Sequence, residues 1–275
     1  MSFLSIIPPA PLNVLVETIW DWTAAPQPHR LERIVPVANA GLILNLSEDQ
    51  TRVYDDEQHC LYFSGATLDG PRTRSHLIDT DEQVAVMGVV FRPGGAATFF
   101  RERMDRLANG SVDLDALMGR RACALRERLL DTDDARGRLA LLQQELSRWL
   151  GTRAMPASAR PLAHALQALD ADPRVAALAS VARELGSSPR QLGELFRQQV
   201  GMTPKRYLRL RRFHQVVNHV GNGAGDRNRI DWAGIALDCG YHDQAHLAHE
   251  FREFSGVTPT AFLRATNYHP HIVPA

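Results

Sequence analysis

Cysteine, lysine and long apolar runs are scarce in this sequence of 275 residues, and the shortages of cysteine and of apolar runs each exclude a class of protein. The three cysteines, Cys60, Cys123 and Cys239, lie far apart with no CxxC pair, which argues against a disulfide framework and against a cysteine zinc site. No apolar run reaches the roughly 18 residues that a membrane span needs, and the N-terminal MSFLSIIPPAPL is a poor signal peptide. We therefore expect a cytoplasmic protein with no membrane partner.

Positive charge is concentrated in the second half of the chain, although the formal net charge of the whole is zero. Residues 1–155 carry 17 Arg and no Lys against 21 acidic residues, whereas residues 156–275 carry 13 Arg and one Lys against 10. The two parts therefore have net charges of −4 and +4. A basic half is a weak indication of a polyanionic partner. Because Arg outnumbers Lys 30 to 1 along the chain, charge alone does not decide the function.

The period of the hydrophobic pattern changes along the chain and predicts two domains. Short apolar or alternating runs between turn residues predict the strands of a β-sandwich or barrel at 41–46, 60–67, 74–80 and 84–91. Apolar residues at helical spacing then predict helices over 96–107, 113–131 and 135–150. The stretch GTRAMPASARP (151–161) is typical of a linker, so we expect an N-terminal domain over 1–155 and an all-helical domain over 156–275.

A unit that occurs twice in the C-terminal part is the strongest signal in the sequence. The copies are SVARELGSSPRQLGELFRQQVGMTPKRYL (180–208) and GIALDCGYHDQAHLAHEFREFSGVTPTAFL (234–263). Each predicts a helix that ends at a glycine, a tight turn, and a second helix that begins at a side-chain cap. The recurring positions, in pairs, are Ala182 and Ala236, Gly186 and Gly240, Leu192 and Leu247, Phe196 and Phe251, and Gly201 and Gly256.

These copies predict helix-turn-helix units at about 174–200 and 231–255, joined by a long helix over about 204–220. Ser188 is the predicted cap of the second helix in the first unit, with Gln191 placed for a capping box, and Asp243 is the equivalent cap in the second unit. A generic helical bundle with a chance repeat is the alternative. It explains less, because caps, glycines and core positions all recur in register.

His242, His246 and His249 have two interpretations. On a helical wheel Phe251 falls beside Leu247 in the predicted core, and the three histidines fall on the opposite face. If the rings converged on one ion, they would form the centre of a metal-dependent enzyme, which is the alternative function. A recognition helix in the major groove uses the same face to read base edges, and we favour this interpretation.

The second copy, with GYHDQAHLAHEFREFSGVTPTAFL, resembles the AraC/XylS family of bacterial transcription regulators, and GSSPRQLGELFRQQVGMTPKRYLRLRRF is similar to that family's first helix-turn-helix. The resemblance covers roughly residues 160–265. It implies two recognition helices in adjacent major grooves, about 34 Å apart. It also implies a sequence-specific DNA-binding regulator rather than an enzyme, with double-stranded DNA and RNA polymerase as partners and no cofactor.

Carried over onto this sequence, the resemblance separates residues that read bases from residues that hold the DNA backbone. The candidates for base contacts are Arg190, Glu194, Gln244, Ala245, His246 and His249. The candidates for phosphate contacts are Arg197, Lys205 and Arg252. Gly193 departs from the family pattern, which often has a longer polar side chain there, and so the contacts of the first helix stay open. Glu194 would accept from cytosine N4 or pair with Arg190.

In the N-terminal part, ERIVPVANAGLILNL, FSGAT and GVVFRPGG look like the sensor-type domains that precede this DNA-binding unit. The likeness implies an α+β domain, a cupin-like β-barrel or sandwich followed by helices, that binds a small-molecule effector, forms a homodimer, or does both. A protein partner in place of the effector is the alternative. We expect no metal, because no HxH with a following Glu occurs and His29, His59 and His76 are isolated.

Overall fold

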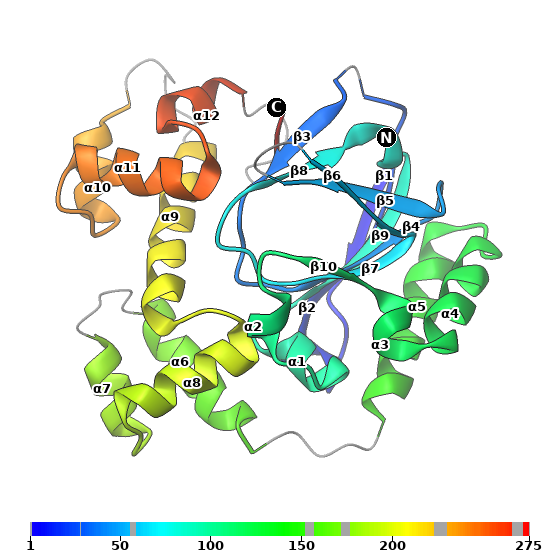
Figure 1. Cartoon of the computed structure of the whole chain (residues 1–275), viewed down its shortest axis with the longest axis horizontal. Coiled ribbons are helices and arrows are strands. Elements are labelled where there is room, and N and C mark those ends of the chain that lie inside the picture. Colours follow the sequence, from blue (N-terminus) through cyan, green and yellow to red (C-terminus); the bar gives the residue numbers. More distant parts are fainter. Residues whose placement is uncertain are drawn as a thin grey trace.

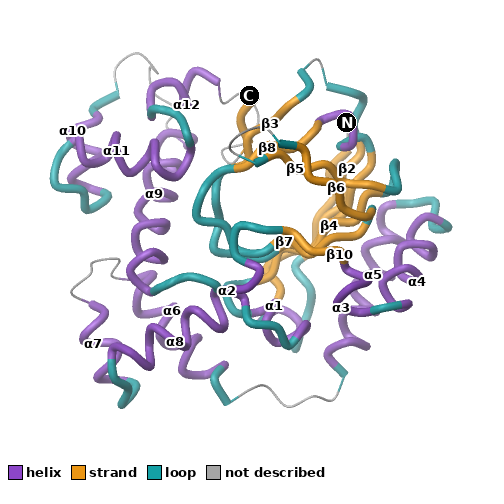
Figure 2. The backbone as a smooth tube through the Cα atoms, viewed as in Figure 1, coloured by secondary structure: helices purple, strands orange, loops and turns teal. Residues whose placement is uncertain are grey.

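The computed structural model describes residues 2–27, 29–55, 59–151, 157–171, 177–222, 230–265 and 272–274. Two β-sheets with their helices form the N-terminal part, and helices form nearly all of the C-terminal part (Figures 1 and 2). This is the two-domain fold class predicted from the sequence. The predicted boundary at residue 155 and the start of the predicted unit at 174–200 lie outside the described residues. The likeness to a cupin stays a prediction.

The paired strands of both sheets are antiparallel. The first sheet has, in spatial order, β1 (Ser2–Ile6), β2 (Val16–Thr23), β9 (Ala85–Phe91), β4 (Gly41–Asn45), β7 (Ala66–Asp69) and β10 (Ser111–Asp113). The second has β11 (Ile272–Pro274), β3 (Leu31–Ile34), β8 (His76–Asp79), β5 (Gln50–Tyr54) and β6 (Cys60–Ser64). The strand β11 therefore follows the helical domain in the chain but belongs to a sheet of the N-terminal domain (Figure 1).

Alternation along the strands explains how the first sheet packs on helices. In β4, Leu42 and Leu44 are fully buried in the N-terminal core, while Ile43 between them points to the other face and is partly exposed. The predicted strand at 60–67 is in fact two, because the chain passes at Gly65 from one sheet to the other. A Cβ on Gly65 would lie 2.9 Å from the backbone carbonyl oxygen of Glu48, so a larger residue would force the chain to shift at this crossing.

In the described part of the N-terminal domain, five helices complete the fold. They are α1 (Gly95–Phe100), α2 (Met104–Leu107), α3 (Leu114–Met118), α4 (Arg120–Leu130) and α5 (Ala135–Leu150), with short 3-10 turns at Leu12–Val14 and Thr80–Glu82. The helix predicted over 135–150 is confirmed as α5. The helices predicted over 96–107 and 113–131 are each divided in two, because Arg101 (φ +57°) ends α1 and Gly119 (φ +57°) separates α3 from α4.

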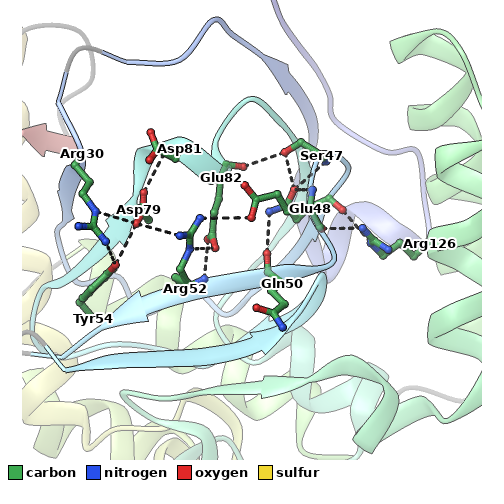
Figure 3. A network of polar contacts seen from close by, with 11 residues as sticks. Arg30, Ser47, Glu48, Gln50, Arg52, Tyr54, Asp79, Asp81, Glu82 and Arg126 are labelled. Atoms are coloured by element: carbon green, nitrogen blue, oxygen red, sulfur yellow. Dashed lines mark hydrogen bonds and ion pairs between the residues drawn. The ribbon is translucent and has the colours of Figure 1, made fainter.

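Buried carboxylates tie the strands of the second sheet to the turn that follows β8 (Figure 3). Asp79 and Glu82 are both fully buried. Asp79 accepts a hydrogen bond from the hydroxyl of Tyr54 at 3.1 Å and from Nε of Arg30 at 3.4 Å. Glu82 accepts from the backbone N–H of Arg52 at 2.6 Å and from its Nε at 2.5 Å. Burial raises the pKa of Glu82, and the bonds from Arg52 oppose that rise.

The described residues of the C-terminal part form seven helices around a shared core. They are α6 (Ala159–Ala171), α7 (Ala177–Glu184), α8 (Pro189–Val200), α9 (Pro204–Asn222), α10 (Trp232–Asp238), α11 (Gln244–Ser255) and α12 (Pro259–Ala265). The core is rich in aromatic rings, and Phe213 of α9 lies 4.9 Å from Phe251 and 5.3 Å from Phe254 between ring centroids. As predicted, a long helix, α9, joins the two helix-turn-helix units (Figure 1). Within the described part of the chain, we find no helix long and apolar enough to cross a membrane.

Candidate nucleic-acid interface

The first helix-turn-helix unit consists of α7, a tight turn and α8. The turn contains Gly186, whose φ of +60° lies in the left-handed region that favours glycine. Ser188 caps α8, since its Oγ accepts from the backbone N–H of Gln191 at 3.2 Å. Oε1 of Gln191 in turn accepts from the backbone N–H of Ser188 at 2.8 Å, which completes the predicted capping box. Local sequence therefore defines where α8 begins.

The second unit, α10 and α11, repeats this construction with different residues. Oδ1 of Asp231 accepts from the backbone N–H of Gly234 at 3.0 Å and caps α10. The turn contains Gly240, with φ of +75°. Oδ1 of Asp243 accepts from the backbone N–H of His246 at 2.7 Å and caps α11. We call α8 and α11 the recognition helices.

Equivalent apolar residues hold both recognition helices in the core. Leu192 and Phe196 of α8 are 2% and 0% exposed, and Leu247 and Phe251 of α11 are 1% and 0% exposed. The opposite face of each helix is thereby turned outward, as the periodicity predicts. Six of the residues predicted to contact DNA are exposed: Arg190, Lys205, Gln244, Ala245, His249 and Arg252. The other three, Glu194, Arg197 and His246, are half-buried.

Glu194 of α8 is held by side chains from both domains. Its carboxylate accepts hydrogen bonds from Nε2 of Gln198 at 2.7 Å, Nη1 of Arg103 at 2.8 Å and Nη2 of Arg197 at 3.2 Å. These bonds lower the pKa of Glu194 to about 2, with the Gln198 bond as the largest cause. Arg103 belongs to the N-terminal domain, and no sequence signal predicts this contact between residues so far apart in the chain.

His242, which precedes α11, and His246 and His249 within it make different contacts. Nδ1 of His242 lies 3.1 Å from Oδ2 of Asp243, and Nδ1 of His246 accepts from the backbone N–H of His242 at 3.3 Å. The His246 ring packs edge-on against Tyr241, 5.3 Å between centroids, whereas His249 is exposed one turn further on. Among the residues that the structure describes, no group of three or more His, Cys, Asp or Glu side chains could hold a metal ion.

Arginines of α9 that the sequence analysis left without a role hold the second recognition helix in place. Nε of Arg209 lies 2.6 Å from Oε1 of Glu250, and Nη2 of Arg212 lies 3.4 Å from Oε2 of the same carboxylate. Arg206 and Arg209 both pair with Glu253. Part of the basic charge of the C-terminal half is therefore used inside the domain. The three-residue spacing of these arginines was the available sequence signal.

Two family models match the chain. Residues 4–113 match a domain of unknown function, and residues 181–265, which include both recognition helices, match a helix-turn-helix domain. The C-terminal domain is an AraC-type helix-turn-helix domain. This AraC-type domain makes the chain a DNA-binding transcription regulator and not an enzyme, as the sequence predicts. The alternative of a metal-dependent enzyme is thereby wrong.

Solved structures of similar proteins include whole regulators and isolated domains. ToxT from Vibrio cholerae O395 is 9% identical, with coverage of 96% of this chain and 97% of that one and a TM-score of 0.46. ToxT of strain SCE256 with an unsaturated fatty acid bound is 12% identical, with 96% and 95% coverage and a TM-score of 0.45. An AraC-type regulator from Chromobacterium violaceum is 23% identical, over 40% of this chain and 97% of that one, with a TM-score of 0.34. No curated protein matches the chain.

Proposed function

We propose that the protein is a sequence-specific regulator that reads two neighbouring segments of DNA with α8 and α11. One observation carries this proposal: the two helices share their caps, glycines and core residues but differ on their outward faces. A shared scaffold with different exposed side chains suits two helices that read different bases. A DNA partner supports the cytoplasmic location that we expect from the sequence.

The exposed side chains of α11 are suited to reading base edges. Gln244 can donate to and accept from adenine, Ala245 is small enough to contact a thymine methyl, and His249 lies one turn further along the exposed face. His246 is a weaker candidate, because Tyr241 and the backbone N–H of His242 already contact its ring. Arg252 and Lys205 are exposed and suited to phosphates.

The outward face of α8 offers fewer groups for direct reading. Arg190 is exposed at the first turn, where the guanidinium would bind guanine O6 and N7. Glu194 can accept a hydrogen bond from cytosine N4 only if it gives up one of its present donors. Of these donors, Arg103 comes from the N-terminal domain. Arg197 pairs with Glu194 at 3.2 Å and would have to turn from it to meet a phosphate.

Control by a small polar effector at the N-terminal domain is the second part of the proposal. Five buried polar atoms from β5, β7, β8 and the loop after β7 have no hydrogen-bond partner among the described residues: Thr51 Oγ1, Thr67 Oγ1, Asp69 Oδ1, Arg72 Nε and His76 Nδ1. Arg72 is charged and lies near both Asp69 and His76. Buried polar atoms in proteins are nearly always satisfied, so the neighbouring Asp69, Arg72 and His76 support an effector with both donors and acceptors.

Selection from randomised duplexes tests the DNA-reading part. We expect the full chain to enrich a motif with two half-sites about one helical turn apart. Failure to enrich any motif under conditions where the protein is folded would remove the proposal. Binding at 50 to 200 mM salt then separates specific reading from general attraction to the backbone.

Thermal melting tests the effector part independently of DNA. We expect one member of a panel of small carboxylic acids and sugars to raise the melting temperature of the wild type but not of Arg72→Ala. If no compound does so and a protein partner is captured through residues 1–151, the alternative of a protein-binding domain is favoured. Association with RNA polymerase and formation of a homodimer are further proposals, checked by co-purification and by sedimentation.

A further inference from the structure

The ends of both recognition helices rest on the N-terminal domain. Gly201 follows α8 with φ of +81°, and a Cβ there would lie 2.4 Å from Cγ of Pro71 and 2.8 Å from the carbonyl oxygen of Met104. Gly256 follows α11 with φ of +76°, and a Cβ there would lie 3.0 Å from Nη1 of Arg33. Gly201 and Gly256 are equivalent positions of the repeat. The N-terminal domain therefore contacts the same point on each helix-turn-helix unit.

One short segment, residues 71–75, reaches both contacts. Pro71 lies against Gly201, and the carbonyl oxygen of Thr73 accepts from Nη2 of Arg206 at 2.8 Å. Ser75 donates its backbone N–H to the carbonyl oxygen of Phe254 at 2.9 Å. Its hydroxyl also donates to the carbonyl oxygen of Ser255 at 3.1 Å. The segment thus connects the end of α8, the start of α9 and the end of α11.

The segment is itself fixed to the body of the N-terminal domain. The backbone N–H of Arg72 donates to the carbonyl oxygen of Val37 at 2.8 Å, and its Nη2 donates to Oγ of Ser111 at 3.0 Å. The backbone N–H of Thr73 donates to Oδ1 of Asn109 at 2.8 Å. With its backbone anchored at several points, the segment can hold the helices it contacts at a set separation.

We infer that segment 71–75 is a positioning element that fixes the separation and orientation of the two recognition helices on DNA. The two helix-turn-helix units are joined by α9 within the chain and a second time by their shared contacts with this segment. The segment holds the C-terminal ends of α8 and α11, while the candidate base-reading residues Arg190, Gln244, Ala245 and His246 lie at their N-terminal ends. Contact with the segment and contact with bases at these N-terminal ends are therefore compatible.

Four glycines of the repeat supply a matched test. Gly201→Ala and Gly256→Ala place a methyl group against the N-terminal domain. Gly186→Ala and Gly240→Ala impose a similar backbone penalty at φ of +60° and +75°. Among the described residues, a Cβ at Gly186 would have no neighbour within 4 Å, and one at Gly240 would meet Cδ of Arg212 at 3.6 Å. Ser75→Ala removes the hydroxyl bond to the carbonyl oxygen of Ser255 at the end of α11 without any backbone strain. It is the test variant to use if a glycine variant fails to fold.

The measurement is binding of the full chain to the selected duplex and to duplexes with one or two base pairs inserted between the half-sites. Because the inference rests on the proposed DNA reading, the wild type must first yield a motif; without one, the proposed function itself has failed. We expect the wild type to prefer the selected spacing by about tenfold, and Gly201→Ala, Gly256→Ala and Ser75→Ala by less than about threefold. The control variants should keep the tenfold preference. If the three test variants also keep it, segment 71–75 does not set the spacing, and the inference is overturned.

Discussion

Nη1 of Arg103 lies 2.8 Å from Oε1 of Glu194, an ion pair that joins the N-terminal domain to the outward face of the first recognition helix. The two residues are 91 positions apart in the chain. Their side chains are 38% and 41% exposed, so solvent screens the pair. Its importance therefore lies in where it places Glu194 rather than in stability.

A double-mutant cycle of Arg103→Ala and Glu194→Ala should give a coupling energy below about 1 kcal/mol that decreases with added salt. The contrast is the pair of Arg138 and Asp21, where Nε lies 2.7 Å from Oδ2 and the side chains are only 15% and 4% exposed. Arg138→Ala should lower the free energy of unfolding by about 3 kcal/mol, because it leaves a buried carboxylate unpaired. Chemical denaturation measures the coupling energy of the first pair and the loss on Arg138→Ala. Equal values would contradict the conclusion that the Arg103–Glu194 pair adds little stability.

Glu194→Ala should relax the base preference at a single position of the selected motif, with a loss of about 1–3 kcal/mol in discrimination. Glu184→Ala is the control, because Glu184 is a carboxylate of the same unit that lies on α7 and not on the recognition helix. Repeating the duplex selection with each variant tests this. An unchanged motif with Glu194→Ala would show that this carboxylate only pairs with its neighbours.

His249→Ala and Arg252→Ala should weaken DNA binding in different ways. The first should cost about 1–3 kcal/mol on the selected duplex and little on a scrambled one, because base contacts specify sequence. The second should weaken both duplexes alike and reduce the slope of log K against log salt by about 0.9. Salt titrations on both duplexes separate these outcomes. If the two variants behaved identically, the assignment of their roles would fail.

Glu250→Ala should lower the free energy of unfolding by about 2 kcal/mol, because it leaves Arg209 and Arg212 without their buried partner. Glu253→Ala is the matched control on the same helix, with a side chain that is 36% exposed, and should cost less than about 1 kcal/mol. Urea denaturation measures the difference. Equal losses would mean that burial of Glu250 adds nothing to the link between α9 and α11.

Stability should fall on acidification in a way that depends on His76. Burial, with a contribution from Arg72, lowers the pKa of His76 well below its usual value near 6.5. The unfolded chain then binds a proton below about pH 6.5 that the folded chain does not, so the free energy of unfolding falls by up to about 1.4 kcal/mol per pH unit from there down to the folded pKa. His76→Gln should reduce this slope between about pH 6.5 and 5. If the pH slope of the free energy of unfolding is unchanged in His76→Gln, other titrating groups cause it.

Local features were predictable from the sequence, because nearby residues determine them. The caps at Ser188 and Asp243, the glycine turns at Gly186 and Gly240, and the helix at 135–150 all follow from side chains within one turn. The same rules predicted which face of each recognition helix would be exposed.

Features that depend on partners distant in the chain were not predictable. The ends of the helices at Arg101 and Gly119 were also missed, because the helical spacing of apolar residues continues through both positions. Two contacts depend on how the domains dock: the pairing of Arg103 with Glu194, and the contact of segment 71–75 with both units. The spacing of residues in the sequence does not predict how domains dock. Whether the nine predicted residues contact DNA stays a prediction.

Pairing of β11 with β3 has a consequence for how the protein is made. Ile272 lies opposite Ile34, so the second sheet receives its last strand only after the whole helical domain has been synthesised. Until then β3 has β8 on one side and an open row of backbone donors and acceptors on the other. During translation the nascent N-terminal domain would expose this unpaired edge of β3, which could pair with other strands, until residues 272–274 pair with it.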